Sequence, residues 1–132
     1  MGQGHYTALV WGVLGDEADL VYETDEDGDR DIAKWANPAI GGWGKGAYVD
    51  KSYESETPWL GVMAGCTDGV LAGRRKGAAD LEYAAMSLGD VASAYAPSVA
   101  IAREKWEEFR KLASANGVTL PQGGLLLVFD YH

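Results

Sequence analysis

The chain has 132 residues, of which 47% are apolar and 11% aromatic, and residues 1–132 are expected to form a single globular domain with one hydrophobic core. This composition excludes an intrinsically disordered chain, and no apolar run approaches the roughly 20 residues of a membrane span. The net charge of −9 argues against direct binding of nucleic acid, because a phosphate backbone repels an acidic surface.

The N-terminal part of the chain begins with an apolar run. Residues 5–14, HYTALVWGVL, are nearly all apolar and predict a strand that is covered on both faces. Residues 19–23, DLVYE, alternate and predict a second, shorter strand, which leads into an acidic turn around Gly28. Residues 30–36, RDIAKWA, predict about two helical turns that end at the following Asn-Pro pair.

A glycine-rich segment separates this part from the next strand. Four of the six residues in 41–46 are glycine, which costs a helix or an inner strand too much backbone entropy, so we expect a long loop that carries Trp43. Residues 58–66 are again apolar and of strand length, and we expect them to pair with residues 5–14. A basic turn follows at residues 73–77, where contact with phosphate, contact with the acidic segment and simple solvation all stay open.

The second half of the chain predicts helices and then a strand. Apolar residues recur at helical spacing in residues 78–88, which predicts a short helix. The same spacing continues across Pro97 over residues 90–115 and predicts one long, kinked helix. Residues 123–131 form an apolar run without alternation, which predicts another strand covered on both faces. The expected fold class is α+β, with a mixed sheet whose buried strands lie near both termini and are covered by these helices.

The negative charge is concentrated in one segment. Between residues 16 and 31 there are nine acids and one base, Arg30, whereas the rest of the chain is nearly neutral. A basic protein would relieve the repulsion among these acids and would be attracted over about a Debye length, roughly 8 Å. We expect an interface with Trp35 and Trp43 as candidate aromatic anchors. Its charged residues would be Asp16, Glu17, Asp19, Glu23, Asp25, Glu26, Asp27, Asp29 and Asp31.

The same segment partly matches a calcium-binding loop. Gly28 takes the turn position of a twelve-residue loop, but Lys34 stands where a bidentate glutamate should complete the ligand shell, and a strand rather than a helix precedes the loop. A weaker site for calcium or magnesium and a solvated acidic turn are the two alternatives. The acids that would supply oxygen ligands are Glu23, Asp25, Asp27, Asp29 and Asp31.

Patterns for catalysis and nucleotide binding are weak. The glycines of residues 41–46 do not have the spacing of a phosphate-binding loop. Cys66 lies in an apolar strand, where an inert thiol is usual, and His5 and His132 lie near opposite chain ends. Asp130 ends an apolar strand, where capping by the backbone and a functional role are both open. We therefore expect no catalytic residue, and no cofactor other than the metal considered above.

These features predict a non-catalytic acidic domain that binds a basic protein, in its sharpest form a nucleic-acid-binding one. It would act as an inhibitor or adaptor that mimics nucleic-acid charge. In charge alone it is similar to the acidic anti-restriction and anti-CRISPR proteins of phages, and no motif supports that likeness. The alternatives are a divalent-metal protein or metal-dependent enzyme using the carboxylates of residues 23–31, and a structural subunit of a homo-oligomer. The single cysteine and the lack of an N-terminal leader predict a cytoplasmic location without a membrane partner.

Overall fold

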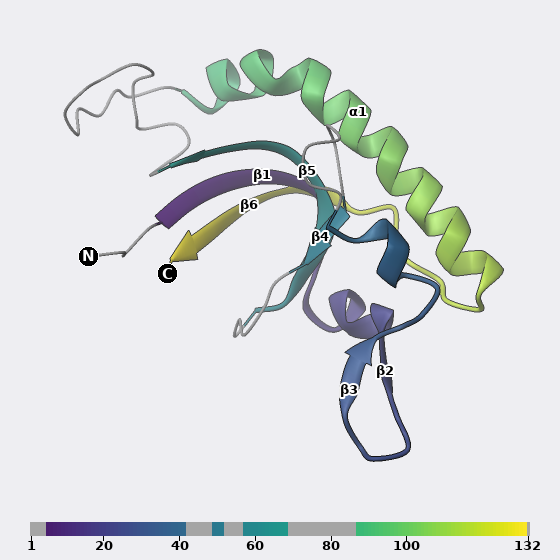
Figure 1. Ribbon diagram of the computed structural model, residues 1–132. Helices are drawn as coiled ribbons and strands as arrows, with labels where there is room; N and C mark the ends of the chain where they lie inside the picture. Colours follow the sequence, from purple (N-terminus) through teal and green to yellow (C-terminus); the bar gives the residue numbers. More distant parts are fainter. Residues whose placement is uncertain (1–4, 42–48, 52–56, 69–86, 132) are drawn as a thin grey trace.

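The computed structural model describes residues 5–41, 49–51, 57–68 and 87–131 (Figure 1). The fold class is α+β, as predicted: a four-stranded sheet carries a long helix on one face. In chain order the elements are β1 (His5–Leu14), the 3-10 helix η1 (Gly15–Val21), β2 (Tyr22–Thr24), β3 (Arg30–Ile32), the 3-10 helix η2 (Asn37–Ala39), β4 (Val49–Lys51), β5 (Trp59–Asp68), α1 (Leu88–Ala115) and β6 (Gly124–Tyr131).

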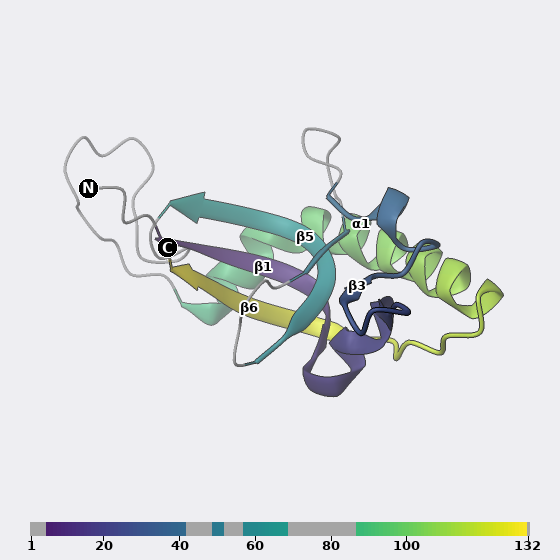
Figure 2. The same ribbon diagram turned by 60° about the horizontal axis from the view of Figure 1, so that its bottom comes forward.

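The main sheet has the strand order β4-β5-β1-β6. Its neighbouring strands are all antiparallel, whereas a mixed sheet was expected. Among the described residues, the isolated bridge between Ile40 and Val49 is a parallel contact at the outer side of β4. β1 pairs with β5, as predicted, and pairs with β6 on its other side (Figure 2). The N-terminal strand is therefore central, and the C-terminal strand lies at an edge.

Helix α1 runs without interruption from Leu88 to Ala115 and passes through Pro97, as its apolar spacing predicts. Ser87 caps the helix, because its hydroxyl oxygen accepts a hydrogen bond from the backbone N–H of Asp90 at 3.0 Å. Beyond the other end Gly117 has φ 81°, the left-handed conformation that stops many helices. α1 packs mainly over β5 and β1, which leaves β6 beside the helix rather than under it.

The larger core lies between α1 and the sheet. Trp106 of α1 and Leu60 and Val62 of β5 are fully buried there. The indole N–H of Trp106 donates a hydrogen bond to the carbonyl oxygen of Pro121 at 3.1 Å. This bond ties the chain that leaves α1 back onto the helix and so fixes where β6 begins.

A row of three glycines crosses the main sheet. Gly61, Gly12 and Gly124 are direct neighbours on β5, β1 and β6. A Cβ atom at Gly12 would overlap the backbone of Leu60 and Gly61, and a Cβ atom at Gly61 would lie 2.6 Å from the carbonyl oxygen of Trp11. The absence of side chains therefore lets β5 cross β1 closely and curl (Figure 2).

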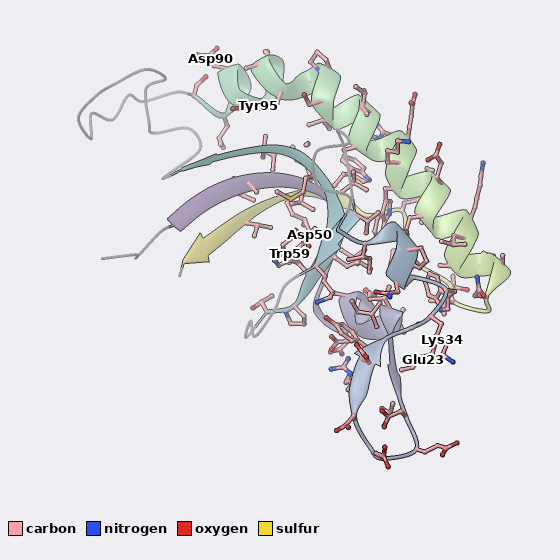
Figure 3. The ribbon with its side chains drawn as sticks, viewed as in Figure 1. Glu23, Lys34, Asp50, Trp59, Asp90 and Tyr95 are labelled. Carbon is pink, nitrogen blue, oxygen red and sulfur yellow. The ribbon has the colours of Figure 1, made fainter. Side chains whose placement is uncertain are left out.

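The curl of β5 closes a second, smaller core on the face of the sheet away from α1. Trp59 at the start of β5 is buried there together with Met63, Ala8, Val10 and Val128. Figure 3 shows Trp59 beneath the sheet, on the side opposite α1. Between Ala8 and Val13, strand β1 is thus covered on both faces, which agrees with its largely apolar sequence.

Two local predictions in the acidic region are wrong. Residues 19–21 of the strand predicted at 19–23 belong to η1, because Ala18 and Val21 lie one 3-10 turn apart and both enter the core, whereas residues 22–23 do lie in strand β2. Residues 30–32 form strand β3 rather than the start of a helix, because they pair with residues 22–24. In both segments the tertiary contacts outweigh the local preference.

Strand β4 and the surroundings of β6 also differ from expectation. The short strand β4 was not predicted, since residues 49–51 follow the glycine-rich segment without an apolar run of their own. Leu125 and Leu127 are 45% and 51% exposed, so β6 is not covered on both faces. The physical reason is the position of α1 over β5 and β1.

Some predictions concern parts of the chain outside the described residues. These parts are residues 78–86 of the helix expected at 78–88, the loop residue Trp43, the basic turn at 73–77, His132, and the side chains of His5, Cys66 and Asp130. The last two residues of that expected helix are the N-cap Ser87 and the first residue of α1, Leu88.

Candidate functional site

The acids of residues 16–31 lie on η1 and on the hairpin formed by β2 and β3. This hairpin, residues 22–32, is called the acidic hairpin below. It projects from the end of the sheet at which β1 ends, on the side away from α1 (Figure 1). Eight of the nine acids are exposed, and Asp19 is half-buried. Because Ala18 and Val21 are buried in the core and anchor η1, the base of this acidic element is held in place.

The register of the acidic hairpin brings two acids face to face. Tyr22 pairs with Ile32, and both are partly buried against the core, which fixes the base of the hairpin. At the next position Glu23 lies directly opposite Asp31. Like charges in directly opposed positions of an antiparallel pair destabilise it. The repulsion between these two carboxylates therefore destabilises the hairpin, and the contacts at its base stabilise it.

The turn of the hairpin is organised by Asp25. Its carboxylate oxygen Oδ1 accepts hydrogen bonds from the backbone N–H groups of Asp27 and Asp29, both at 2.9 Å. The backbone N–H of Asp25 in turn donates to the carbonyl oxygen of Asp29 at 2.8 Å, and Gly28 has φ 84°. Asp25 thus has a structural role that an asparagine also fulfils in such turns. The carboxylates of Asp27 and Asp29 have no such role.

Arg30 is the base that compensates part of this charge. Its guanidinium group forms an ion pair with Asp19 of η1 at 3.1 Å and lies 4.6 Å from the ring centroid of Tyr22. These contacts connect β3 to β2 and to η1. Among the described residues, none of the other eight acids of the segment forms an ion pair. Most of the negative charge is therefore free to meet another molecule.

The carboxylates expected to bind a metal are only partly brought together. Oxygen atoms of Asp25, Asp27 and Asp29 lie within 4.8 Å of one another, and all three side chains are exposed. Glu23 and Asp31 lie on the two strands and do not belong to this group. Lys34, the residue at the twelfth loop position, lies near the base of the hairpin, at the level of Glu23 (Figure 3). Exposed acidic groups of this kind are common without an ion, so the geometry gives no support for a built metal site.

Of the two tryptophans expected to act as aromatic anchors, the structure describes Trp35. Trp35 is half-buried, and its ring packs against Phe109 of α1 with the ring centroids 5.7 Å apart and the planes at 36°. It therefore contributes to the core and holds the chain after the hairpin against the helix. Trp43 lies outside the described residues. Of the residues expected to form the interface, those that the structure describes as exposed are all acidic.

Two buried charges were not anticipated. Asp50 and Lys51 of β4 are only 8% and 7% exposed. The carboxylate of Asp50 accepts a hydrogen bond from the backbone N–H of Lys51 at 2.8 Å, and the ammonium nitrogen of Lys51 lies 5.5 Å from the ring centroid of Tyr22. Both side chains have partners, so their burial fits a structural role. A sequence signal for them was lacking, because a charged pair after a glycine-rich segment is typical of an exposed loop.

The strand register also shows whether the backbone brings Cys66 close to His5, as a catalytic thiol–imidazole pair would require. Cys66 lies opposite Ala8, whereas His5 lies three residues earlier on β1 and opposite Tyr131. The backbone therefore does not set His5 and Cys66 side by side as cross-strand neighbours.

The chain matches no known protein family, no curated protein and no solved structure. Within the described part of the chain, no helix combines the length and the apolar character needed to cross a membrane. Among the described residues, the acidic hairpin stands out because it projects from the sheet, is exposed and has one ion pair.

Proposed function

We propose that this protein binds a positively charged protein through the acidic hairpin and η1, as an inhibitor or adaptor without catalytic activity of its own. One observation carries the proposal: eight exposed acids lie on η1 and on the projecting acidic hairpin that follows it, and among the described residues Arg30 forms the one ion pair of this segment. Charge gathered in this way acts over a distance and accelerates the approach of an oppositely charged surface.

The physical driving force is relief of repulsion. Glu23 and Asp31 face each other, and Asp25, Asp27 and Asp29 crowd the turn. Cationic side chains of a partner would lower this repulsion and gain charge-assisted hydrogen bonds with the same carboxylates. Both contributions weaken as salt rises, because the charges are exposed and screened over about 8 Å at physiological ionic strength.

The charge density of the hairpin supports a partner that also binds nucleic acid. Six acids and one arginine lie on the hairpin, and an arm of about five residue steps spans roughly 17 Å. The net charge is then about one per 3 to 4 Å, close to the spacing of about 3.4 Å along one strand of DNA and half the density of a duplex. A groove that binds a single strand suits this spacing better than one that binds a duplex.

The test measures binding to a labelled oligoarginine peptide by fluorescence anisotropy at low and at physiological salt. The double variant Asp27→Asn with Asp29→Asn removes two charges and keeps Asp25, which builds the turn. Because an exposed charge pair is worth roughly 0.3 to 0.7 kcal/mol, we expect the dissociation constant to rise about three- to tenfold.

The matched control is Glu104→Gln with Glu108→Gln, which changes the net charge equally on exposed positions of α1. We expect it to leave binding within about twofold of the wild type. Equal losses in the two double variants would mean that overall acidity, and not the hairpin, attracts the peptide. To test the finer proposal, a basic single-strand-binding protein is captured on the chain, and single-stranded DNA should release it while the Asp27 and Asp29 variant should fail to hold it.

A further inference from the structure

Strand β6 lies at one edge of the main sheet, as far as the chain is described. It pairs with β1 on one side, from His5 opposite Tyr131 to Gly12 opposite Gly124. On its other side no strand of the described chain pairs with it. The outward N–H and C=O groups of such a strand form a template for a further strand.

This edge lacks the features that usually protect one. The β1–β6 register has no bulge, and residues 124–129, GLLLVF, contain neither proline nor charge. Leu125 and Leu127 are 45% and 51% exposed. They lie opposite Trp11 and Leu9 and so point to the α1 face, but α1 packs mainly over β5 and β1 and does not cover them.

The other edge of the same sheet is protected. Strand β4 has three residues, two of them the charged Asp50 and Lys51. Its outer side is bridged by the chain at Ile40, and the backbone N–H of Gly41 donates to the carbonyl oxygen of Val49 at 2.8 Å. Strand β4 thus protects this edge at residues 60–62 of β5, the stretch with which it pairs.

We propose that β6 pairs antiparallel with β6 of a second copy of this chain, which gives a two-fold symmetric dimer with a continuous sheet of both copies. This surface is distinct from the acidic hairpin, so the inference does not depend on the proposed function. A two-fold axis perpendicular to the sheet makes the paired strands antiparallel and keeps both α1 helices on the same face. Leu125 and Leu127 of both copies then meet in the space between the two helices.

A second copy fits this edge because the edge is uncharged and because the symmetric contact ends with two copies. Each copy has a net charge of −9, yet residues 124–129 bring no charge into the contact. Asp130 lies near the end of β6, so in the antiparallel pair the two Asp130 residues, one from each copy, lie at opposite ends of the contact. Because the two-fold contact uses the β6 edge of both copies, the pairing stops at two copies and does not extend into a filament. A cationic partner, in contrast, has no group to bind along this strand.

The first test is the mass of the full chain in solution, measured by sedimentation equilibrium from micromolar concentrations to about 200 µM. We expect a reversible dimer with twice the chain mass of 14.1 kDa. The variant Leu125→Lys with Leu127→Lys should raise the dissociation constant at least about tenfold, because it places four cations together at the edge. The control Leu88→Lys alters a leucine that is 84% exposed at the start of α1 and should leave the dimer intact.

Hydrogen exchange provides an independent readout that does not depend on a variant. Amide protons along residues 124–129 should exchange more slowly at high than at low protein concentration, whereas those of the acidic hairpin should not change. A wild-type chain that is monomeric throughout, a dimer that survives both lysine substitutions, or a dimer without concentration-dependent protection of β6 would each overturn the proposal.

Discussion

Substitution of Gly12 by alanine tests whether the close approach of β5 to β1 requires a residue without a side chain at this position. The added Cβ atom would overlap the carbonyl oxygen of Leu60 and the Cα atom of Gly61, and it would lie 2.8 Å from the carbonyl carbon of Leu60. All three atoms belong to the backbone of β5, so no side chain can rotate away. The strands would have to separate, and the hydrogen bonds between them at this point would lengthen.

The change in the free energy of unfolding follows from three contributions. Overpacking in a well-packed region costs about 1 to 3 kcal/mol. Stretching one or two ladder hydrogen bonds adds about 1 kcal/mol each, and the lower entropy of the unfolded alanine chain returns about 0.4 to 1 kcal/mol. The expected net loss is about 3 kcal/mol, which corresponds to roughly 10 °C in melting temperature for a domain of this size.

The matched control is Gly124→Ala in the same row. A Cβ atom there would meet nothing within 4 Å, and the residue does not have positive φ. We expect it to be neutral or to stabilise by up to about 1 kcal/mol. Urea unfolding followed by tryptophan fluorescence and circular dichroism measures both variants. If Gly12→Ala unfolds within about 1 kcal/mol of Gly124→Ala, the reasoning about close strand crossing is wrong.

Three further changes test the hairpin and the core. Glu23→Lys turns the repulsive pair with Asp31 into an attractive one and should raise the free energy of unfolding by about 0.5 kcal/mol, a gain that urea titrations should no longer show in about 1 M NaCl. Calcium at about 5 mM should raise the melting temperature no more than magnesium does, because Asp25 already bonds the turn; a shift of several degrees with calcium alone would indicate a specific site. Trp106→Phe loses the hydrogen bond to Pro121 and leaves a gap, and should cost about 2 kcal/mol in the same urea assay.

The sequence predicts the parts of this fold whose pattern is set by burial over many residues. Residues 5–14 are nearly all apolar, and between Ala8 and Val13 strand β1 is covered by α1 on one face and by the curl of β5 on the other. Residues 90–115 keep helical spacing because one stripe of α1, including Ala102, Trp106 and Phe109, faces the core. Long segments of this kind need no knowledge of their neighbours to be recognised.

Short segments were missed because their structure depends on partners elsewhere in the chain. Residues 30–32 become a strand only by pairing with residues 22–24, and residues 15–21 become a 3-10 helix only because Ala18 and Val21 enter the core. The apolar run at residues 123–131 reads the same for a central strand as for an edge strand. Its exposure is decided by the position of α1, which no local pattern contains.

The candidate site was predictable in location but not in internal order. The count of acids alone places the charge between residues 16 and 31. It does not show that Asp25 is used by the turn, that Arg30 bridges Asp19 and Tyr22, or that Trp35 is packed against α1. These roles divide the segment into acids that support the hairpin and acids, such as Asp27, that are free to bind.

The two proposed surfaces have a joint consequence, because a dimer through β6 carries two acidic hairpins. If both hairpins reach one partner, the second contact forms within a complex and the apparent affinity exceeds that of a single hairpin by about 10² or more. Variants of Leu125 and Leu127 would then weaken binding to an extended basic partner although they lie outside the hairpin, and would leave binding to a short oligoarginine peptide unchanged. Variants of Asp27 and Asp29 would weaken both. This difference shows how much of the affinity comes from the charge of the hairpin and how much from dimerisation through β6.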